Sequence, residues 1–297
     1  MRIPGSLLIV LAVLAVVTAA ALAQSNWDKV QIKTTPLADG VWMLQGAGGN
    51  IGVCAGPDGV LLIDDQFAEL NDKLEAAVMA VSKSPIRWVL NTHWHGDHTG
   101  GNELLAAAGA TIVAHDNVRT RLGKDSKDEI FGWESKAVPS RAWPVVTFED
   151  RVTFHLNGHD IECFHVKDAH TDGDVVVWFK DLNVIHAGDV MFTNMYPVID
   201  VATGGSIDGM IAGCDRILKL ANADTKIVAG HGALATRADV QASRDMMAVV
   251  RDRVRKLQKA GKTTDAIVAA KPLADLEAKW GGGFVKADQM VKQAAAR

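Results

Sequence analysis

The sequence predicts an α/β fold in which helices pack against a β-sheet. Short apolar runs bounded by turn residues alternate with longer segments of helical periodicity, which is the pattern of strands connected by helices. The chain has 297 residues, of which 48% are hydrophobic and 22% charged. This composition provides enough apolar side chains for a large core and excludes a disordered chain. One large domain or two small ones fit the length.

Strands and helices alternate through the first half of the chain. Residues 24–40 are interpreted as a lead-in, and Pro85 ends the first predicted helix. Leu70, Leu74 and Val78 fall on one face of that helix. The predicted elements are strands at 41–44, 50–55 and 60–63, a helix at 68–82, a strand at 86–90, a helix at 103–108 and a strand at 111–114.

The second half continues with strands and a helical tail. Asn157-Gly158 is the most specific hairpin signal in the chain, and Pro272 and the glycines at 281–283 interrupt the tail. The polar connection at 116–143 is either a flap over the functional site or a plain surface excursion. The predicted elements are strands at 152–156, 161–166, 175–179 and 183–186, a helix at 207–220, a strand at 226–229 and a helix at 238–258.

The N-terminus is typical of a secretory signal peptide at residues 1–23. Arg2 supplies a positive charge, residues 7–17 are an unbroken apolar run, and Ala21 and Ala23 form a small-residue cleavage site. An uncleaved membrane anchor is the alternative. The signal predicts a periplasmic or secreted protein that has no membrane partner after cleavage.

Charge and cysteine content narrow the partners further. The formal net charge is -4, so nothing points to nucleic acid, and a small-molecule substrate is the expected partner. Cys54, Cys163 and Cys214 each lie in or beside an apolar segment, which favours three buried thiols. One disulfide pair with a free thiol remains open, because export permits disulfides.

The strongest functional signal is His93-x-His95-x-Asp97-His98, which follows an apolar strand. Alternate residues of an extended chain point the same way, so His93 and His95 can hold one metal ion. Gly96 lets the chain turn, so Asp97 and His98 can face a second ion. Imidazole nitrogens and carboxylate oxygens are ligands that zinc accepts.

Three more candidate ligands stand beside strand ends. His170 follows one predicted strand, Asp189 stands where another ends, and His231 is bracketed by glycines after a third. Functional residues of layered α/β folds gather on loops that a rigid scaffold positions. A lone histidine is more often structural than a ligand, so these residues gain weight only together with the first motif.

The ordered set of His-x-His-x-Asp-His, then a histidine, an aspartate after glycine and a Gly-His resembles the metallo-β-lactamase superfamily over residues 40–235. The resemblance implies an αββα sandwich of two mixed sheets flanked by helices. It divides the chain into the signal, a catalytic domain at 24–235 and a helical C-terminal segment at 236–297 packed on it.

The resemblance also implies a role for each candidate ligand in a site with two zinc ions per chain. The two ions would share a hydroxide that attacks a carbonyl. Asp97 would be the catalytic residue that orients this nucleophile. The implied ligands are His93, His95 and His170 for the first ion, Asp97, His98 and His231 for the second, and Asp189 as a bridge.

The expected activity is that of a β-lactamase-like zinc hydrolase acting on an amide or ester carbonyl. The signal and the set Asp97, His98 and His231 favour this interpretation. Asp189 stands where common β-lactamases of the superfamily have cysteine or serine. This aspartate resembles that of lactonases, glyoxalase II thioesterases and phosphodiesterases, which remain the alternative. A di-iron oxidoreductase and a non-catalytic metal-binding protein are the non-hydrolase alternatives.

A few other residues are candidates for supporting roles. Asn194, Tyr196 and Trp94 are expected substrate contacts, although packing is at least an equal interpretation of the tyrosine and the favoured one of the tryptophan. Trp133 is a further candidate to line the cleft. His186 precedes Asp189 by three residues and is expected to support it from outside the ligand shell.

Overall fold

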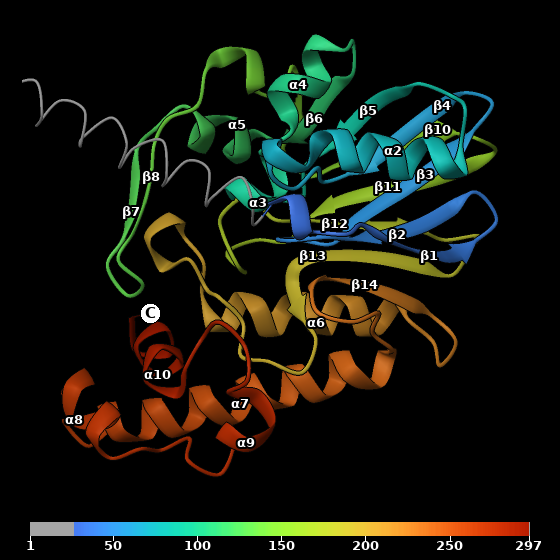
Figure 1. The fold of residues 1–297 in the computed structure, drawn as a ribbon. Coiled ribbons are helices and arrows are strands. Elements are labelled where there is room, and N and C mark those ends of the chain that lie inside the picture. Colours follow the sequence, from blue (N-terminus) through green and yellow to red (C-terminus); the bar gives the residue numbers. More distant parts are fainter. Residues whose placement is uncertain (1–26, 297) are drawn as a thin grey trace, which may run out of the picture.

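The computed structural model describes residues 27–296, and the expected signal peptide at 1–23 lies outside them. Two β-sheets lie face to face and helices cover the outer face of each (Figure 1). The predicted αββα architecture is therefore confirmed. None of the helices in this part of the chain is long and apolar enough to cross a membrane.

The first sheet has seven strands in the order β1-β2-β3-β4-β5-β6-β9. The first four form an antiparallel meander and the last four run parallel, so the sheet is mixed. The strands are β1 (Lys33–Ala38), β2 (Val41–Gln45), β3 (Ile51–Gly56), β4 (Gly59–Ile63), β5 (Ile86–Leu90), β6 (Thr111–His115) and β9 (Val146–Phe148). β1 corrects the lead-in interpretation of residues 24–40. Its Pro36 masks the strand pattern and is tolerated because β1 is an edge strand.

The second sheet has five strands in the order β10-β11-β12-β13-β14. Only the pair β13 and β14 is parallel. The strands are β10 (Arg151–Leu156), β11 (His159–His165), β12 (Val175–Phe179), β13 (Val184–Phe192) and β14 (Lys226–His231). Asn157 and Gly158 both have positive φ at the tip of the β10–β11 hairpin, as the sequence predicts. β13 is longer than predicted and carries Asp189 inside it, at a shift in its register with β14.

The core consists of three apolar layers that follow the alternation of strand side chains. Along β4, Leu61 and Ile63 pack between the two sheets, whereas Val60 and Leu62 pack against the helices outside. A third cluster lies between the second sheet and the C-terminal helices. The three cysteines are buried and unpaired, as expected.

Helices flank the sheets on both sides (Figure 1). Those over the first sheet are the 3-10 turn η1 (Ala68–Leu70), α2 (Asn71–Val81), α3 (Gly96–Thr99), α4 (Asn102–Ala107) and α5 (Asp116–Leu122). The helical elements that follow β13 in the chain are η3 (Val201–Thr203), α6 (Ile207–Leu220), α7 (Arg237–Lys259), α8 (Thr264–Ala269), α9 (Glu277–Trp280) and α10 (Ala287–Ala296). A capping box between Thr236 and Asp239 begins α7, which packs against α6.

The segment at 116–143 is folded rather than an irregular loop. It contains α5, the antiparallel hairpin of β7 (Ser126–Asp128) and β8 (Trp133–Ser135), and the turn η2 (Ser140–Ala142). The rings of Phe131 and Trp133 stack with centroids 4.4 Å apart. β7 lies against η3, so the hairpin reaches across to the second half of the chain (Figure 1).

Candidate metal centre

The structure brings together the seven side chains that the sequence identified as candidate ligands. They lie on segments that follow β5 and β11, within β13 and at the end of β14. They form three groups whose ligand atoms lie within 4.8 Å of one another: His93, His95 and His170; His93, His98 and Asp189; and Asp97, His98 and His231. Two groups share His93 and two share His98, so the whole set is one continuous cluster.

The first motif reaches the cluster through a short local turn. His95 keeps an extended backbone and is the N-cap of α3, which begins at Gly96. The helical turn then carries Asp97 and His98 back toward the histidines before it, because three residues of helix nearly complete one turn. The two ends of the motif therefore face each other across the cluster.

The other three ligands depend on the second sheet. Asp189 follows Gly188, whose φ is 51°, at the register shift of β13. His231 ends the neighbouring strand β14. His170 is fully buried in the segment after β11, and its backbone carbonyl accepts a hydrogen bond from the Asp200 amide.

Hydrogen bonds outside the cluster fix which nitrogen of His95 and His170 carries a proton. His95 Nε2 donates to Asp200 Oδ2 at 3.0 Å, and His170 Nδ1 donates to the Val198 carbonyl at 2.7 Å. The other nitrogens, His95 Nδ1 and His170 Nε2, face each other at 2.9 Å. In neutral rings both of these atoms bear lone pairs, so their approach is repulsive unless a cation or a proton lies between them.

The same logic applies to His98 and His93. His98 Nδ1 donates to Asp64 Oδ2 at 2.8 Å, which leaves Nε2 for the cluster. Thr92 donates its hydroxyl to Asp64 at 2.8 Å, so its oxygen accepts from His93 Nδ1 at 3.1 Å. His93 Nε2 is then buried without a hydrogen-bond partner. A buried unpartnered nitrogen is costly, and metal ligation is what satisfies it.

The two carboxylates of the cluster complete the donor set. Asp189 Oδ2 lies 3.4 Å from Nε2 of both His170 and His231, and its Oδ1 lies 3.2 Å from His98 Nε2. Asp97 Oδ2 lies 3.2 Å from His231 Nε2. Adjacent ligands of a tetrahedral zinc ion are separated by roughly 3.3 Å. The residues present therefore fit a pair of divalent cations, with Asp189 between them.

Charges within the cluster perturb the ionisation of its members. Burial opposes a charge on His231, but Asp189 and Asp97 outweigh burial and raise the pKa of His231 to about 9. Burial likewise opposes the charge of Asp97, but His98 and His231 lower its pKa to about 2. Burial lowers the pKa of His170 to about 4. The carboxylates thus hold protons on part of the cluster, and a metal ion binds by displacing them.

Two glycines permit the close packing of the cluster. A Cβ on Gly230 would lie 1.8 Å from Asp189 Oδ1, and a Cβ on Gly49 would lie 2.2 Å from His98 Cε1. Real side chains cannot approach so closely, so only glycine fits either position. The sequence contains a hint of this role, because Gly230 and Gly232 stand on either side of the candidate ligand His231.

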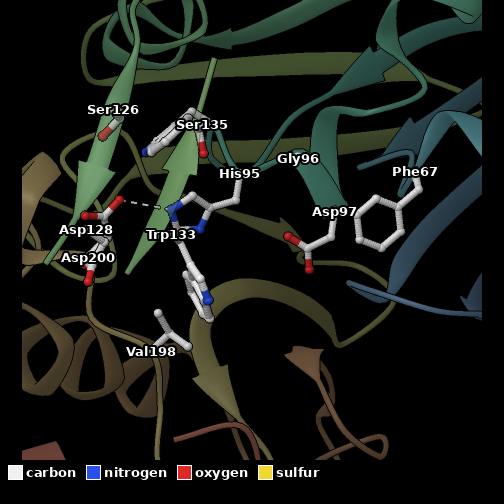
Figure 2. A pocket seen from close by; sticks show the side chains of 11 residues that line it. Phe67, His95, Gly96, Asp97, Ser126, Asp128, Trp133, Ser135, Val198 and Asp200 are labelled. Atoms are coloured by element: carbon white, nitrogen blue, oxygen red, sulfur yellow. Dashed lines mark hydrogen bonds and ion pairs between the residues drawn. The ribbon is translucent and has the colours of Figure 1, made fainter. Parts of the chain in front are cut away.

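The cluster opens into a cleft of about 230 Å³ whose lining includes His95 and Asp97 (Figure 2). Trp94 and Trp133 both line it, the second from the hairpin β7–β8. Trp94 also donates from Nε1 to the Thr203 hydroxyl at 3.3 Å. The segment at 116–143 therefore forms one wall of the cleft, which is the flap interpretation rather than the plain excursion.

Other expected contacts lie elsewhere. Tyr196 is fully buried in the apolar cluster beneath the C-terminal helices and is not among the residues that line the cleft, which favours the packing interpretation. Asn194 is exposed at a positive φ and is not among the residues that line the cleft. His186 bonds through Nε2 to the Asn50 carbonyl at 3.2 Å, and its Nδ1 accepts from the amide of Gly188, the residue before Asp189.

The residues that sequence reasoning missed are the partners that orient the ligands. Asp64 is hydrogen-bonded to His98, Thr92 to His93, and Asp200 to His95. Asp64 has a φ of 65°, a conformation in which aspartate is more tolerated than most residues. The sequence shows that Asp64 ends a buried strand. It does not show that Asp64 bonds to His98, because the two residues are 34 positions apart.

The chain matches the model of the Metallo-beta-lactamase superfamily over residues 45–232. It is 32% identical over 149 residues to a hydroxyacylglutathione hydrolase of Methylococcus capsulatus, covering 48% of this chain and 47% of that protein. It is 23% identical over 184 residues to a metallo-beta-lactamase type 2 of Bacteroides fragilis, covering 59% of this chain and 68% of that protein. The chain thus spans about half the length of the first of these relatives.

Solved structures share the fold at low sequence identity. A sec-alkylsulfatase from Pseudomonas sp. has a TM-score of 0.68 at 17% identity, covering 89% of this chain and 50% of that one. A metallo-beta-lactamase from Pontibacter korlensis has a TM-score of 0.62 at 19% identity, covering 73% and 99%. The chain belongs to the metallo-β-lactamase superfamily, and its clustered histidines and aspartates form its candidate metal site.

Proposed function

We propose that this protein is a binuclear zinc hydrolase that cleaves an acyl carbonyl bond in an ester, thioester, lactone or amide. The observation that carries the proposal is the convergence of histidine lone pairs with two carboxylates at the floor of a cleft. Four imidazole rings each bond outward through one nitrogen, so the other nitrogen of each ring faces the cluster. Nitrogen and carboxylate donors in this proportion suit zinc.

The residues divide between two ions in the way that the superfamily suggests. His93, His95 and His170 would hold one ion, Asp97, His98 and His231 would hold the other, and Asp189 faces members of both sets. When bound, the pair of ions lowers the pKa of water to about 7 and polarises a carbonyl.

The chain's own residues position the reaction. Asp97 lines the cleft, and its Oδ2 faces His231, so its Oδ1 is left to orient an attacking water and accept a proton. Asp200 and the Val198 carbonyl keep the lone pairs of His95 and His170 directed inward. Trp94 and Trp133 shield the reacting carbonyl from bulk water.

An ester or thioester is the first candidate for the bond that is cleaved. It is supported by Asp189 in the bridging position and by the similarity to a hydroxyacylglutathione hydrolase. A β-lactam amide is the second candidate, supported by the similarity to a metallo-beta-lactamase type 2 and by the set Asp97, His98 and His231.

A panel of four substrates separates these candidates. The kcat/KM of zinc-loaded protein is measured with an uncharged homoserine lactone, a glutathione thioester, a carbapenem and a bis-aryl phosphate. We expect cleavage of at least one carbonyl substrate and the slowest reaction with the phosphate. If the carbapenem is the slowest of the four, the second candidate is withdrawn, and a preference for the phosphate contradicts the proposal.

A ligand variant tests the role of the cluster directly. His95→Ala is expected to lose activity and zinc stoichiometry together. His155→Ala, an exposed histidine on β10, is the matched control. A His95→Ala protein with two bound zinc ions and an unchanged rate contradicts the assignment.

A further inference from the structure

The hairpin β7–β8 presents two chemically different faces. Ser126 pairs with Ser135 and Asp128 pairs with Trp133, and all four residues line the cleft. Lys127 lies between Ser126 and Asp128 in β7, so it points to the opposite face, where it pairs with Glu129 at 3.0 Å. The strand alternation therefore directs a carboxylate and an indole into the cleft and keeps the lysine out.

The charged side chains that line the cleft beside the ligands are acidic. Asp128 and Asp200 both line it, and the lining contains no lysine or arginine among the residues that the structure describes (Figure 2). Asp200 is paired with His95. Asp128 Oδ1 accepts hydrogen bonds from the Ile130 and Phe131 amides at 2.7 and 2.8 Å. Within residues 27–296, Asp128 forms no ion pair with a basic side chain, so its charge is not neutralised by a neighbour.

Exposed aromatic rings stand at the mouth of the same site. Trp133 is 50% exposed, although its ring stacks on Phe131. Phe284, which follows the three glycines of the C-terminal segment, is 62% exposed and meets the ring of His231 edge-on at 5.5 Å. Phe67 lines the cleft beside Asp97. Large apolar rings held open to solvent around a polar centre are typical of a surface that buries an apolar ligand.

We propose that the cleft selects acyl substrates that are uncharged or cationic and carry a bulky apolar group, and that Asp128 discriminates against substrates with a carboxylate. This inference rests on the proposed hydrolase function and names its substrate class. The polarisation of the carbonyl by a metal ion is common to all acyl substrates, so we attribute the discrimination by the charge of the acyl chain to the side chains that line the cleft. A carboxylate in the cleft meets Asp128 and finds no basic partner, whereas Trp133 and Phe67, which line the same cleft, gain contacts with an apolar acyl group.

Three phenyl esters that differ in the charge of the acyl chain provide the test. They are the butyrate, the succinate half-ester and the 4-(trimethylammonio)butyrate, each assayed for kcat/KM with zinc-loaded protein. We expect the uncharged and cationic esters to exceed the anionic one by about 10- to 100-fold, which is the effect of one like charge a few ångströms away. A succinate ester cleaved as fast as the butyrate overturns the inference.

Failure of the proposed function gives a different result. If none of the three esters is cleaved, the function as an ester hydrolase is contradicted. The binding of the three corresponding phenyl amides, measured by calorimetry, then still decides the charge preference. Binding of the uncharged and cationic amides in preference to the anionic one supports the inference, and equal binding or a preference for the anionic amide overturns it.

Asp128→Asn is the variant that isolates the charge, because the amide oxygen can still accept from the Ile130 and Phe131 amides. It is expected to reduce the preference for butyrate over succinate by about 10-fold. Asp125→Asn is the matched control, since Asp125 lies just before the same hairpin, is exposed and pairs with Lys136. A preference that is unchanged in Asp128→Asn, or that falls equally in Asp125→Asn, contradicts the role of Asp128.

The apolar part of the inference has its own readout. The ratio of kcat/KM for the phenyl ester of phenylacetate to that of acetate measures how well the cleft binds an aromatic acyl group. Trp133→Ala is expected to lower this ratio by about 10-fold, because the variant loses the contact between the indole and the aromatic ring of the bound acyl group. An unchanged ratio shows that the acyl group does not contact Trp133, which contradicts the proposal that this ring binds the apolar part of the substrate.

Discussion

The two sheets supply the metal centre in different ways. The first sheet gives four ligands from six consecutive residues after one strand, and α3 folds them into place by local geometry. The second sheet gives His170, Asp189 and His231 from three elements that are far apart in sequence. These three ligands meet only because the strands from β11 to β14 lie side by side, in the order β11-β12-β13-β14, in a correctly registered sheet.

This difference indicates where the centre is most easily broken. The local motif tolerates small changes elsewhere in the fold, because its geometry is set within one turn. The ligands of the second sheet depend on a register shift in β13 and on close backbone contact with β14. Small substitutions between these two strands should therefore lower activity strongly, although less than the removal of a ligand.

Asp189→Ala is expected to have the largest effect. It removes the carboxylate that faces both ligand groups, and the ions supply several kcal/mol of transition-state stabilisation. Because each loss of about 1.4 kcal/mol lowers the rate tenfold, kcat/KM should fall by about 10³-fold or more. Activity assays with zinc analysis of the same sample measure this, and a variant that keeps most of its activity contradicts the bridging role.

Gly230→Ala tests the dependence on the β13–β14 contact. The added methyl would lie 1.8 Å from Asp189 Oδ1, so the carboxylate or the strand must shift. A displacement of about 1 Å in a catalytic site costs about 10²-fold in rate, which is the expected loss here. Gly282→Ala is the control, because a Cβ there meets nothing within 4 Å. Equal activity of the two variants would show that the contact is not critical.

Asp64→Asn and Asp200→Asn compare the two ions. Asp64 bonds directly to His98 and reaches His93 only through Thr92, whereas Asp200 bonds directly to His95, so each substitution acts mainly on a different ligand group. Outer partners of metal ligands contribute about 10- to 100-fold to metal affinity, and we expect losses of that size. Competition with a chelator measures the two affinities separately. Identical losses from both sites in both variants would contradict the division of the ligands between two ions.

The smallest expected effect lies outside the centre, at the start of α5. Burial and the stacked ring of His165 lower the pKa of His115, whose Nδ1 accepts from the Asn117 amide. The unfolded chain takes up this proton at about pH 6.5 and the folded chain only at lower pH. Stability is therefore retained above pH 6.5 and decreases as the pH falls below it.

His115→Asn keeps an acceptor at this N-cap and removes the titrating group. We expect the free energy of unfolding of the variant to decrease less between pH 7 and pH 5 than that of the wild type. Urea titrations at several pH values measure the difference. Parallel curves for the two proteins would show that His115 does not contribute to the pH dependence.

The sequence predicted those features whose physical cause is local. Helix α6 and the Asn157-Gly158 hairpin were predicted closely, because periodicity and turn chemistry determine them. The edge strand β1 was missed because Pro36 and polar residues mask its alternation. Asp189 was placed at a strand end, whereas β13 continues to Phe192, because the register shift depends on pairing with β14.

The limits of prediction are clearest around the ligands. The seven candidate ligands were identified from motif and order, but Asp64, Asp200 and Phe284 were not. Their roles arise from contacts between segments 34, 105 and 53 residues apart, which no local pattern records. Tyr196 was expected near substrate, yet the apolar neighbours of its segment bury it beneath the C-terminal helices.

The central claim is that seven side chains hold two zinc ions at one place, and anomalous scattering at the zinc edge tests it most directly. The account predicts two peaks in a crystal of zinc-loaded protein, one beside His93, His95 and His170 and one beside Asp97, His98 and His231, with Asp189 between them. A single peak, or peaks away from these residues, would contradict it.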